Sequence, residues 1–202
     1  MTATLTADKG PTPPPHYLWT REKYEQATAL GLLGPDDKIE LIEGEIVHKM
    51  PQNPPHSTGL TLAQEALRQV FPTGHVFRVQ LPLSVGDFSQ PEPDVAVVLG
   101  FPRDYKDAQP AADRAALVVE VSDTSLLYDQ TQKASMYARA GIQDYWIVNL
   151  IERVLEVRRR PAPQEDAPFG FAYQEALHLS AGETVAPLAT ENAALAVADL
   201  LP

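Results

Sequence analysis

Two near-continuous apolar runs lie in the middle of the chain, PEPDVAVVLG at residues 91–100 and ALVVEVSDTS at residues 116–125. Such runs are typical of central strands that are covered on both faces of a sheet. Each run nevertheless carries a carboxylate, because Asp94 opens the first and Glu120 lies near the end of the second. Since side chains alternate across a strand, Glu120 shares one face with Val118 and Ser122.

Shorter alternating segments predict the remaining strands. KIELIEGEIVHKM at 38–50 alternates on both sides of Glu43 and Gly44, which indicates two strands around a tight turn. HVFRVQLPLSV at 75–85 has a period of two, which predicts a strand that carries Gln80 on the same face as Arg78. Three further strands are expected at 144–150, 153–160 and 171–179, the first two forming a hairpin across Ile151 and Glu152.

Helical periodicity marks three other segments. TREKYEQATALG begins at Thr20, a capping residue, and ends at Gly31. A second helix follows QNPPHSTGL, with Ser57 or Thr58 as its cap and an apolar side formed by Leu60, Ala63, Leu67 and Val70.

The third helix, DQTQKASMYARAG, has the clearest signals. Asp129 is placed to cap it, Gln132 completes a capping box, and Gly141 ends it. The order of helices and strands along the chain predicts an α/β fold with a mixed sheet, and not a simple βαβ alternation.

Length and composition describe an ordinary globular protein. The chain has 202 residues, which suggests one domain at 17–202 after a Pro- and Thr-rich, disordered tail at 1–16. The absence of cysteine excludes disulfides and thiolate metal sites. We expect a cytoplasmic protein without a membrane partner, because the sequence lacks both a signal-peptide pattern and an apolar run of membrane length.

The overall charge is acidic, with a net charge of −11 and a pI near 4.8. Proteins with a large nucleic-acid footprint usually carry a basic excess, so the acidity counts against such a footprint. Arg158, Arg159 and Arg160 form a candidate basic patch, for which a solvated strand end is the alternative interpretation.

The two carboxylates suggest a metal site. A buried carboxylate without a partner costs several kcal/mol, so it is neutralised, paired or bound to metal. If the two strands are antiparallel neighbours, Asp94 and Glu120 come close together, and a divalent cation removes their repulsion. Oxygen ligands of this kind suit Mg²⁺ or Mn²⁺.

A lysine lies on the apolar side of the third helix. Lys133 shares a stripe with Met136, Tyr137 and Ala140. Directed at the sheet, its ammonium would meet the two carboxylates and stabilise charge that develops on a phosphate. The alternative is that the stem is buried while the ammonium reaches solvent.

These residues resemble a known signature. Pro93 and Asp94 followed by Glu120, Val121 and Ser122 resemble the PD-(D/E)XK nuclease pattern, with Ser122 in place of the usual lysine. The chain over residues 20–150 is similar to the Uma-two family of restriction-endonuclease-like proteins, in which the lysine has moved to the following helix. The matching segments are ELIEGE (40–45), PPHS (54–57), PDVAVV (93–98), VVEVS (118–122), YDQTQK (128–133) and YARAGIQDYWIVN (137–149).

The resemblance implies a restriction-endonuclease-like sheet flanked by helices, with an added N-terminal helix and strand pair. It further implies a hydrolase that cuts phosphodiester bonds in nucleic acid, DNA being the expected substrate, and that works as a homodimer. Asp94, Glu120 and the Val121 carbonyl would hold the metal, and Lys133 would replace the missing strand lysine. In related nucleases a glutamine at the position of Gln80 helps to order water at the metal.

Other residues keep two interpretations. One interpretation of His56 is functional, in that it orients a phosphate or transfers a proton. The other is structural, as a residue at the start of the helix or a side chain in solvent. Glu40 and Glu45 either add a carboxylate to the site or decorate the surface, whereas Glu43 is expected in the turn. Asp129 is interpreted as a helix cap, with a catalytic role as the alternative. Tyr137, Tyr145 and Trp146 are interpreted as packing residues.

Two other function classes remain open. One is a catalytically inactive or regulatory binding protein that retains the nuclease scaffold, and the other is a hydrolase of another phosphate ester. Serine hydrolases and zinc enzymes lack support, because the chain has no GxSxG motif and its five histidines show no zinc spacing.

Overall fold

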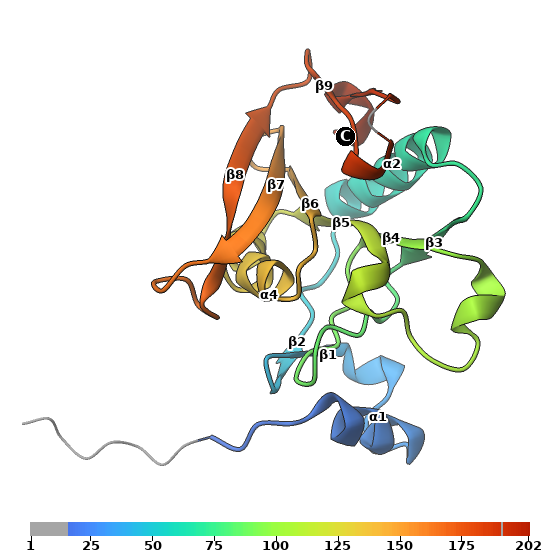
Figure 1. The fold of residues 1–202 in the computed structure, drawn as a ribbon, viewed down its shortest axis with the longest axis vertical. Coiled ribbons are helices and arrows are strands. Elements are labelled where there is room, and N and C mark those ends of the chain that lie inside the picture. The colour runs from blue at the N-terminus through green and yellow to red at the C-terminus, as the bar shows by residue number, and fades with distance from the viewer. Residues whose placement is uncertain (1–15, 191) are drawn as a thin grey trace, which may run out of the picture.

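A six-stranded mixed sheet forms the centre of the computed structural model, which describes residues 16–190 and 192–202 (Figure 1). The strand order is β3-β4-β5-β6-β7-β8, with β5 and β6 parallel and all other neighbours antiparallel. The strands are β3 (His75–Val79), β4 (Val95–Leu99), β5 (Ala115–Ser122), β6 (Asp144–Asn149), β7 (Val154–Pro163) and β8 (Phe171–Leu179). The predicted α/β fold is therefore confirmed, whereas the predicted tail lies outside the described residues except for residue 16.

Helices cover both faces of this sheet, as Figure 1 shows. One face carries α2 (Pro54–Val70) and the C-terminal segment, where Leu67 and Leu200 pack with Trp146. The other face carries α4 (Ala134–Arg139), where Met136 and Tyr137 pack with residues such as Ile147. The C-terminal segment contains β9 (Thr184–Val185), β10 (Leu195–Ala196) and a 3₁₀ turn at Val197–Leu200.

The N-terminal part forms the predicted additional unit at one end of the sheet (Figure 1). Helix α1 (Arg21–Ala29) is capped by Thr20 and precedes the pair β1 (Ile39–Ile42) and β2 (Glu45–His48). Glu43 and Gly44 have φ values of 50° and 85°, the left-handed pair that a tight hairpin turn requires. A Cβ atom at Gly44 would lie 2.7 Å from Leu18 Cβ, so glycine also permits this close approach.

Four 3₁₀ turns complete the connections. They are Pro35–Asp37, Pro102–Tyr105, Ala112–Arg114 and Leu188–Thr190. None of the helices that the structure describes has the length and apolar character that a bilayer span requires.

The cap of α2 differs from the prediction. Asn53, and neither Ser57 nor Thr58, accepts a hydrogen bond from the His56 amide at 3.0 Å. The helix can begin this early because Pro54 and Pro55 occupy its first turn, where an amide hydrogen is not needed. The correction places His56 in the first turn of α2.

The strand that was predicted at 75–85 is shorter than its alternation suggests. It ends at Val79, and Gln80 follows with a φ of 52° in the left-handed region. Gln80 therefore does not share a strand face with Arg78. The turn is held by hydrogen bonds from the Gln80 amide to the carbonyls of Pro93 and Asp94.

The third predicted helix begins earlier and is irregular. A short α3 (Leu126–Tyr128) leads into a π-helical turn at Asp129–Lys133 and then into α4. Asp129 is therefore inside the helical segment and does not cap it. Gly141, at a φ of 78°, follows the end of the segment as predicted.

The candidate basic patch at 158–160 is not formed, and the alternative, a solvated strand end, holds only for Arg160. Arg158 pairs with the buried Glu156, and Arg159 pairs with the buried Asp144 at 2.8 Å. Only Arg160 is exposed. Two of the three guanidinium groups thus neutralise buried acids within the fold.

Candidate active site

Asp94 lies directly before β4 and faces the end of β5. Its Oδ1 atom lies 3.1 Å from His56 Nε2 and accepts a hydrogen bond from Gln80 Nε2 at 3.0 Å. Its Oδ2 atom accepts a hydrogen bond from the Val121 amide at 2.8 Å. Burial raises the pKa of Asp94, but the His56 hydrogen bond and charge, with the Val121 and Gln80 bonds, outweigh it and lower the pKa. In return, the hydrogen bond with Asp94 raises the pKa of His56.

Glu120 is the second carboxylate and is only 3% exposed. Its Oε1 atom accepts hydrogen bonds from Lys133 Nζ at 3.0 Å and from the Tyr137 hydroxyl at 2.9 Å. Its Oε2 atom accepts one from the Asp94 amide at 3.3 Å, which joins the two acidic residues. Burial raises the pKa of Glu120 to about 8. The positive charge of Lys133 lowers this pKa, but the charges of the neighbouring acids oppose that effect.

Lys133 points at the sheet and not toward solvent. Its ammonium lies 3.3 Å from Glu40 Oε1 and 3.8 Å from Asp129 Oδ1, in addition to its contact with Glu120. Burial lowers the pKa of Lys133, but these three carboxylates outweigh that effect and raise it well above its usual value. The lysine therefore stays charged and holds together side chains from β1, β5 and the helical segment.

Asp129 and Lys133 lie four residues apart, so they share one face of the helical segment, which includes a π-helical turn. The Ala134 amide bonds to the Asp129 carbonyl, five residues earlier, so the turn contains one more residue than an α-helix would. Asp129 Oδ2 accepts hydrogen bonds from Ser122 Oγ at 2.7 Å and from Ser125 Oγ at 2.6 Å. Ser122, which occupies the usual lysine position, thus serves to hold Asp129.

The three glutamates of the first strand pair have different surroundings. Glu40 is 4% exposed and joins the site, with its Oε2 atom accepting a hydrogen bond from the Glu92 amide at 3.0 Å. Glu43 lies in the turn, as predicted, and pairs with Arg139. Glu45 is exposed.

Two polar groups of the site differ from the interpretation that the sequence favoured. Tyr137 was interpreted as a packing residue, and it is buried, yet its hydroxyl bonds to Glu120. Asp129 was interpreted as a cap, yet it faces Lys133. Tyr145 and Trp146 pack as expected, with their polar atoms bonded to the Asp129 carbonyl and to Asp144.

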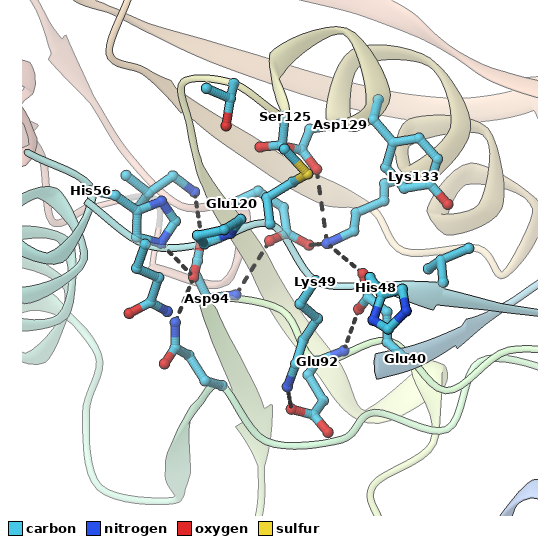
Figure 2. Close-up of a pocket in the computed structure, with 18 of the residues that line it drawn as sticks. Glu40, His48, Lys49, His56, Glu92, Asp94, Glu120, Ser125, Asp129 and Lys133 are labelled. Atoms are coloured by element: carbon cyan, nitrogen blue, oxygen red, sulfur yellow. Dashed lines mark hydrogen bonds and ion pairs between the residues drawn. The ribbon is translucent and has the colours of Figure 1, made fainter. Parts of the chain in front are cut away.

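One pocket with a volume of about 640 Å³ is lined by the acids Glu40, Asp94, Glu120 and Asp129 together with Lys133, His56 and Gln80. Figure 2 shows His56 on one side of Asp94 and Glu120, and His48 and Lys49 on the other. Glu92 pairs with Lys49 at the edge of this pocket. The arrangement gathers negative charge around one buried ammonium.

The donor atoms of the pocket fit a divalent metal only together with further ligands. Among the described residues, no three Asp, Glu or His side chains come close enough together to hold an ion by themselves. Mg²⁺, however, is commonly held by one or two carboxylates together with substrate phosphate. A carboxylate oxygen accepts two hydrogen bonds, so Asp94 Oδ2 and Glu120 Oε2, with one each, retain capacity for a ligand bond. The Val121 carbonyl lies on the same side of β5 as its amide, toward Asp94.

Comparison with known proteins assigns the family. A family model described as "Putative restriction endonuclease" matches residues 21–198. The chain belongs to the Uma2 family. The Uma2 match contains Asp94, Glu120 and Lys133, and it confirms the resemblance seen in the sequence.

A solved structure supports the fold of this Uma2 chain. It is a "putative nuclease belonging to DUF820" from Anabaena variabilis, with a TM-score of 0.61 and 19% sequence identity. The similarity covers 85% of this chain and 94% of the other. No curated protein matches the chain.

Proposed function

We propose that this Uma2 protein is a metal-dependent nuclease that hydrolyses phosphodiester bonds in DNA. The proposal rests on one observation, that Asp94, Glu120 and Lys133 meet in one pocket. They come from three parts of the chain, the residue before β4, strand β5 and the helical segment. Buried carboxylates beside a buried ammonium are costly to maintain for stability alone, which favours a functional role.

Asp94 and Glu120, with the Val121 carbonyl, would hold Mg²⁺ or Mn²⁺. The cation would supply Lewis-acid stabilisation of the charge on the phosphoryl oxygens. Lys133 stabilises the same charge from the helix side, and Gln80 fixes the orientation of Asp94. His56 lines the pocket beside Asp94, where its imidazole is placed to bind a phosphate oxygen or to pass a proton.

Hydrolysis adds water across one P–O bond. The water oxygen bonds to phosphorus, the bond from phosphorus to the leaving oxygen breaks, and the leaving oxygen takes up a proton. One product therefore keeps the phosphate as a monoester, and the other ends in a hydroxyl group.

The test is cleavage of labelled DNA with Mn²⁺, with Mg²⁺ and with EDTA. We expect cation-dependent cleavage that falls by about 100-fold or more in Asp94→Asn and in Lys133→Met. Asp113→Asn and Lys106→Ala are matched controls, because both side chains are exposed. Cleavage that survives both site variants contradicts the assignment.

A non-catalytic binding protein is the second candidate. Two observations favour it. Three carboxylates already surround Lys133. Every carboxylate oxygen of Asp94 and Glu120 already accepts a hydrogen bond. A cation that binds the folded chain must raise its melting temperature. No stabilisation by either cation and no cleavage would favour this second candidate.

A further inference from the structure

The depth of the pocket restricts how a substrate reaches it. Asp94, Glu120 and Lys133 are 7%, 3% and 8% exposed, so the reacting phosphate has to enter the pocket and cannot react across its mouth. The volume of about 640 Å³ falls within the roughly 300–1,000 Å³ of cavities that hold one small molecule.

Two parts of the chain line the pocket on opposite sides of Asp94 and Glu120 (Figure 2). The β1–β2 side contributes Val47, His48 and Lys49, and the start of α2 contributes His56 (Figure 2). A volume of about 640 Å³ is typical of a small-molecule cavity, whereas a duplex, with a major groove that alone is about 12 Å wide, is much bulkier. A duplex therefore does not bring its phosphate to the pocket floor without opening, but an extended single strand does.

The charge of the lining leads to the same conclusion. Five carboxylates line the pocket, together with three lysines, Lys38, Lys49 and Lys133. Lys133 and Lys49 already have acidic partners, and Lys38 forms no ion pair with any residue that the structure describes. A duplex carries about one charge per 1.7 Å, and binding it tightly requires many phosphate contacts. The lysines of this lining can make only one or two such phosphate contacts.

The pocket also offers a surface for a base. Tyr128 lines it and is partly buried, and Met50, which is 54% exposed, belongs to the same lining. Stacking on an aromatic ring is tolerant of base identity, because every base has a π face. A nucleotide of a flexible strand can therefore place its phosphate at the floor and its base against the wall.

We infer that the substrate is a single-stranded segment of nucleic acid, which enters this pocket with one or two phosphates held by Lys38 and Lys49. The inference rests on the proposed nuclease function and narrows its substrate class. Duplex DNA is then cut only where it frays or carries an unpaired stretch.

The experiment compares initial cleavage rates with Mn²⁺ on three labelled probes of the same sequence. They are a 20-nucleotide single strand, its blunt duplex, and that duplex with a central five-nucleotide bulge. We expect the single strand and the bulge to be cut at least about tenfold faster than the closed duplex. For a single strand, each phosphate contact contributes about −0.7 to the slope of log(kcat/KM) against log[NaCl], so one or two contacts should give a slope of about −0.7 to −1.4.

Variants identify the phosphate contacts. Lys38→Asn retains a residue that tolerates the left-handed φ of 50°, and Lys49→Gln retains a polar partner for Glu92. Each should lower kcat/KM on the single strand a few-fold and make the salt slope shallower by about 0.7. Arg160→Ala, an exposed arginine outside the pocket, is the control and should change neither.

Equal or faster cutting of the closed duplex, or a salt slope steeper than about −5, overturns the inference while leaving the nuclease function intact. Unchanged salt slopes in both lysine variants overturn the assigned contacts. Absence of cleavage on all three probes contradicts the proposed function itself, so the two failures are distinguishable.

Discussion

Lys133 donates a hydrogen bond of 3.0 Å to Glu120 in the interior of the protein, where both side chains are at least nine-tenths buried. The bond joins the helical segment to the central strand β5. Desolvation of two such charges offsets most of their mutual attraction, whereas removal of one partner leaves an uncompensated buried charge. The pair therefore makes the fold sensitive to changes in the site.

Replacement of the lysine should show this sensitivity. Lys133→Met leaves Glu120, Glu40 and Asp129 without their shared cation, and we expect a loss of about 3–5 kcal/mol in the free energy of unfolding. Adding Glu40→Gln removes one of the unbalanced charges, so the double variant should regain part of the loss. Urea unfolding at pH 7 measures both. A double variant no more stable than Lys133→Met would show that charge imbalance is not the cause.

The hydroxyl of Tyr137 should matter for activity as well as for stability. Tyr137→Phe removes a hydrogen bond to Glu120, and Tyr173→Phe removes one of the same 2.9 Å length to the Ile142 carbonyl, away from the pocket. Each should cost about 1–2 kcal/mol of unfolding free energy. Only Tyr137→Phe should also slow DNA cleavage, by about tenfold, because the Glu120 carboxylate then loses a hydrogen bond that fixes its orientation. Equal cleavage rates in the two variants would limit Tyr137 to packing.

The sequence was sufficient to predict the central strands and the positions of their acids. Apolar runs broken by Asp94 and Glu120 allow few arrangements, because a one-residue change of register would move Glu120 to the opposite face. The stripe of Lys133, Met136 and Tyr137 likewise predicted a lysine directed at the sheet, one of the two interpretations given above. The strand pair followed from the alternation around Gly44.

The details that were missed depend on backbone conformations that hydrophobic periodicity does not encode. The helical segment begins at Leu126, so Asp129 lies inside it, in a π-helical turn, and faces Lys133. The positive φ of Gln80 ends β3 within a segment that alternates correctly. Asn53 was not predicted as the cap because six residues, the first two of them prolines, separate it from Leu60, where the apolar side of α2 begins.

The Asn53 cap gives a test of that correction. Asn53→Ala removes the acceptor of the His56 amide, and we expect a loss of about 1 kcal/mol in unfolding free energy. Cleavage should also slow, since the first turn of α2 carries His56 to Asp94. Ser57→Ala is the matched control and should change stability by less than about 0.5 kcal/mol. If Ser57→Ala costs as much as Asn53→Ala, the cap is misassigned.

The surroundings of Glu156, which does not line the pocket, predict how the stability of the fold changes in acid. Burial raises its pKa, but hydrogen bonds from Asn149, Arg158 and Gln130 outweigh burial and lower the pKa below its usual value. The unfolded chain therefore takes up a proton first as the pH falls, so the stabilisation is complete above about pH 5 and is lost on further acidification. Glu156→Gln should be less stable than the natural chain at pH 7, and the gap should shrink between about pH 4.5 and pH 3. Urea unfolding across this range, with the exposed Glu65→Gln as control, measures the gap; a gap that stays constant contradicts the role of the Glu156 charge.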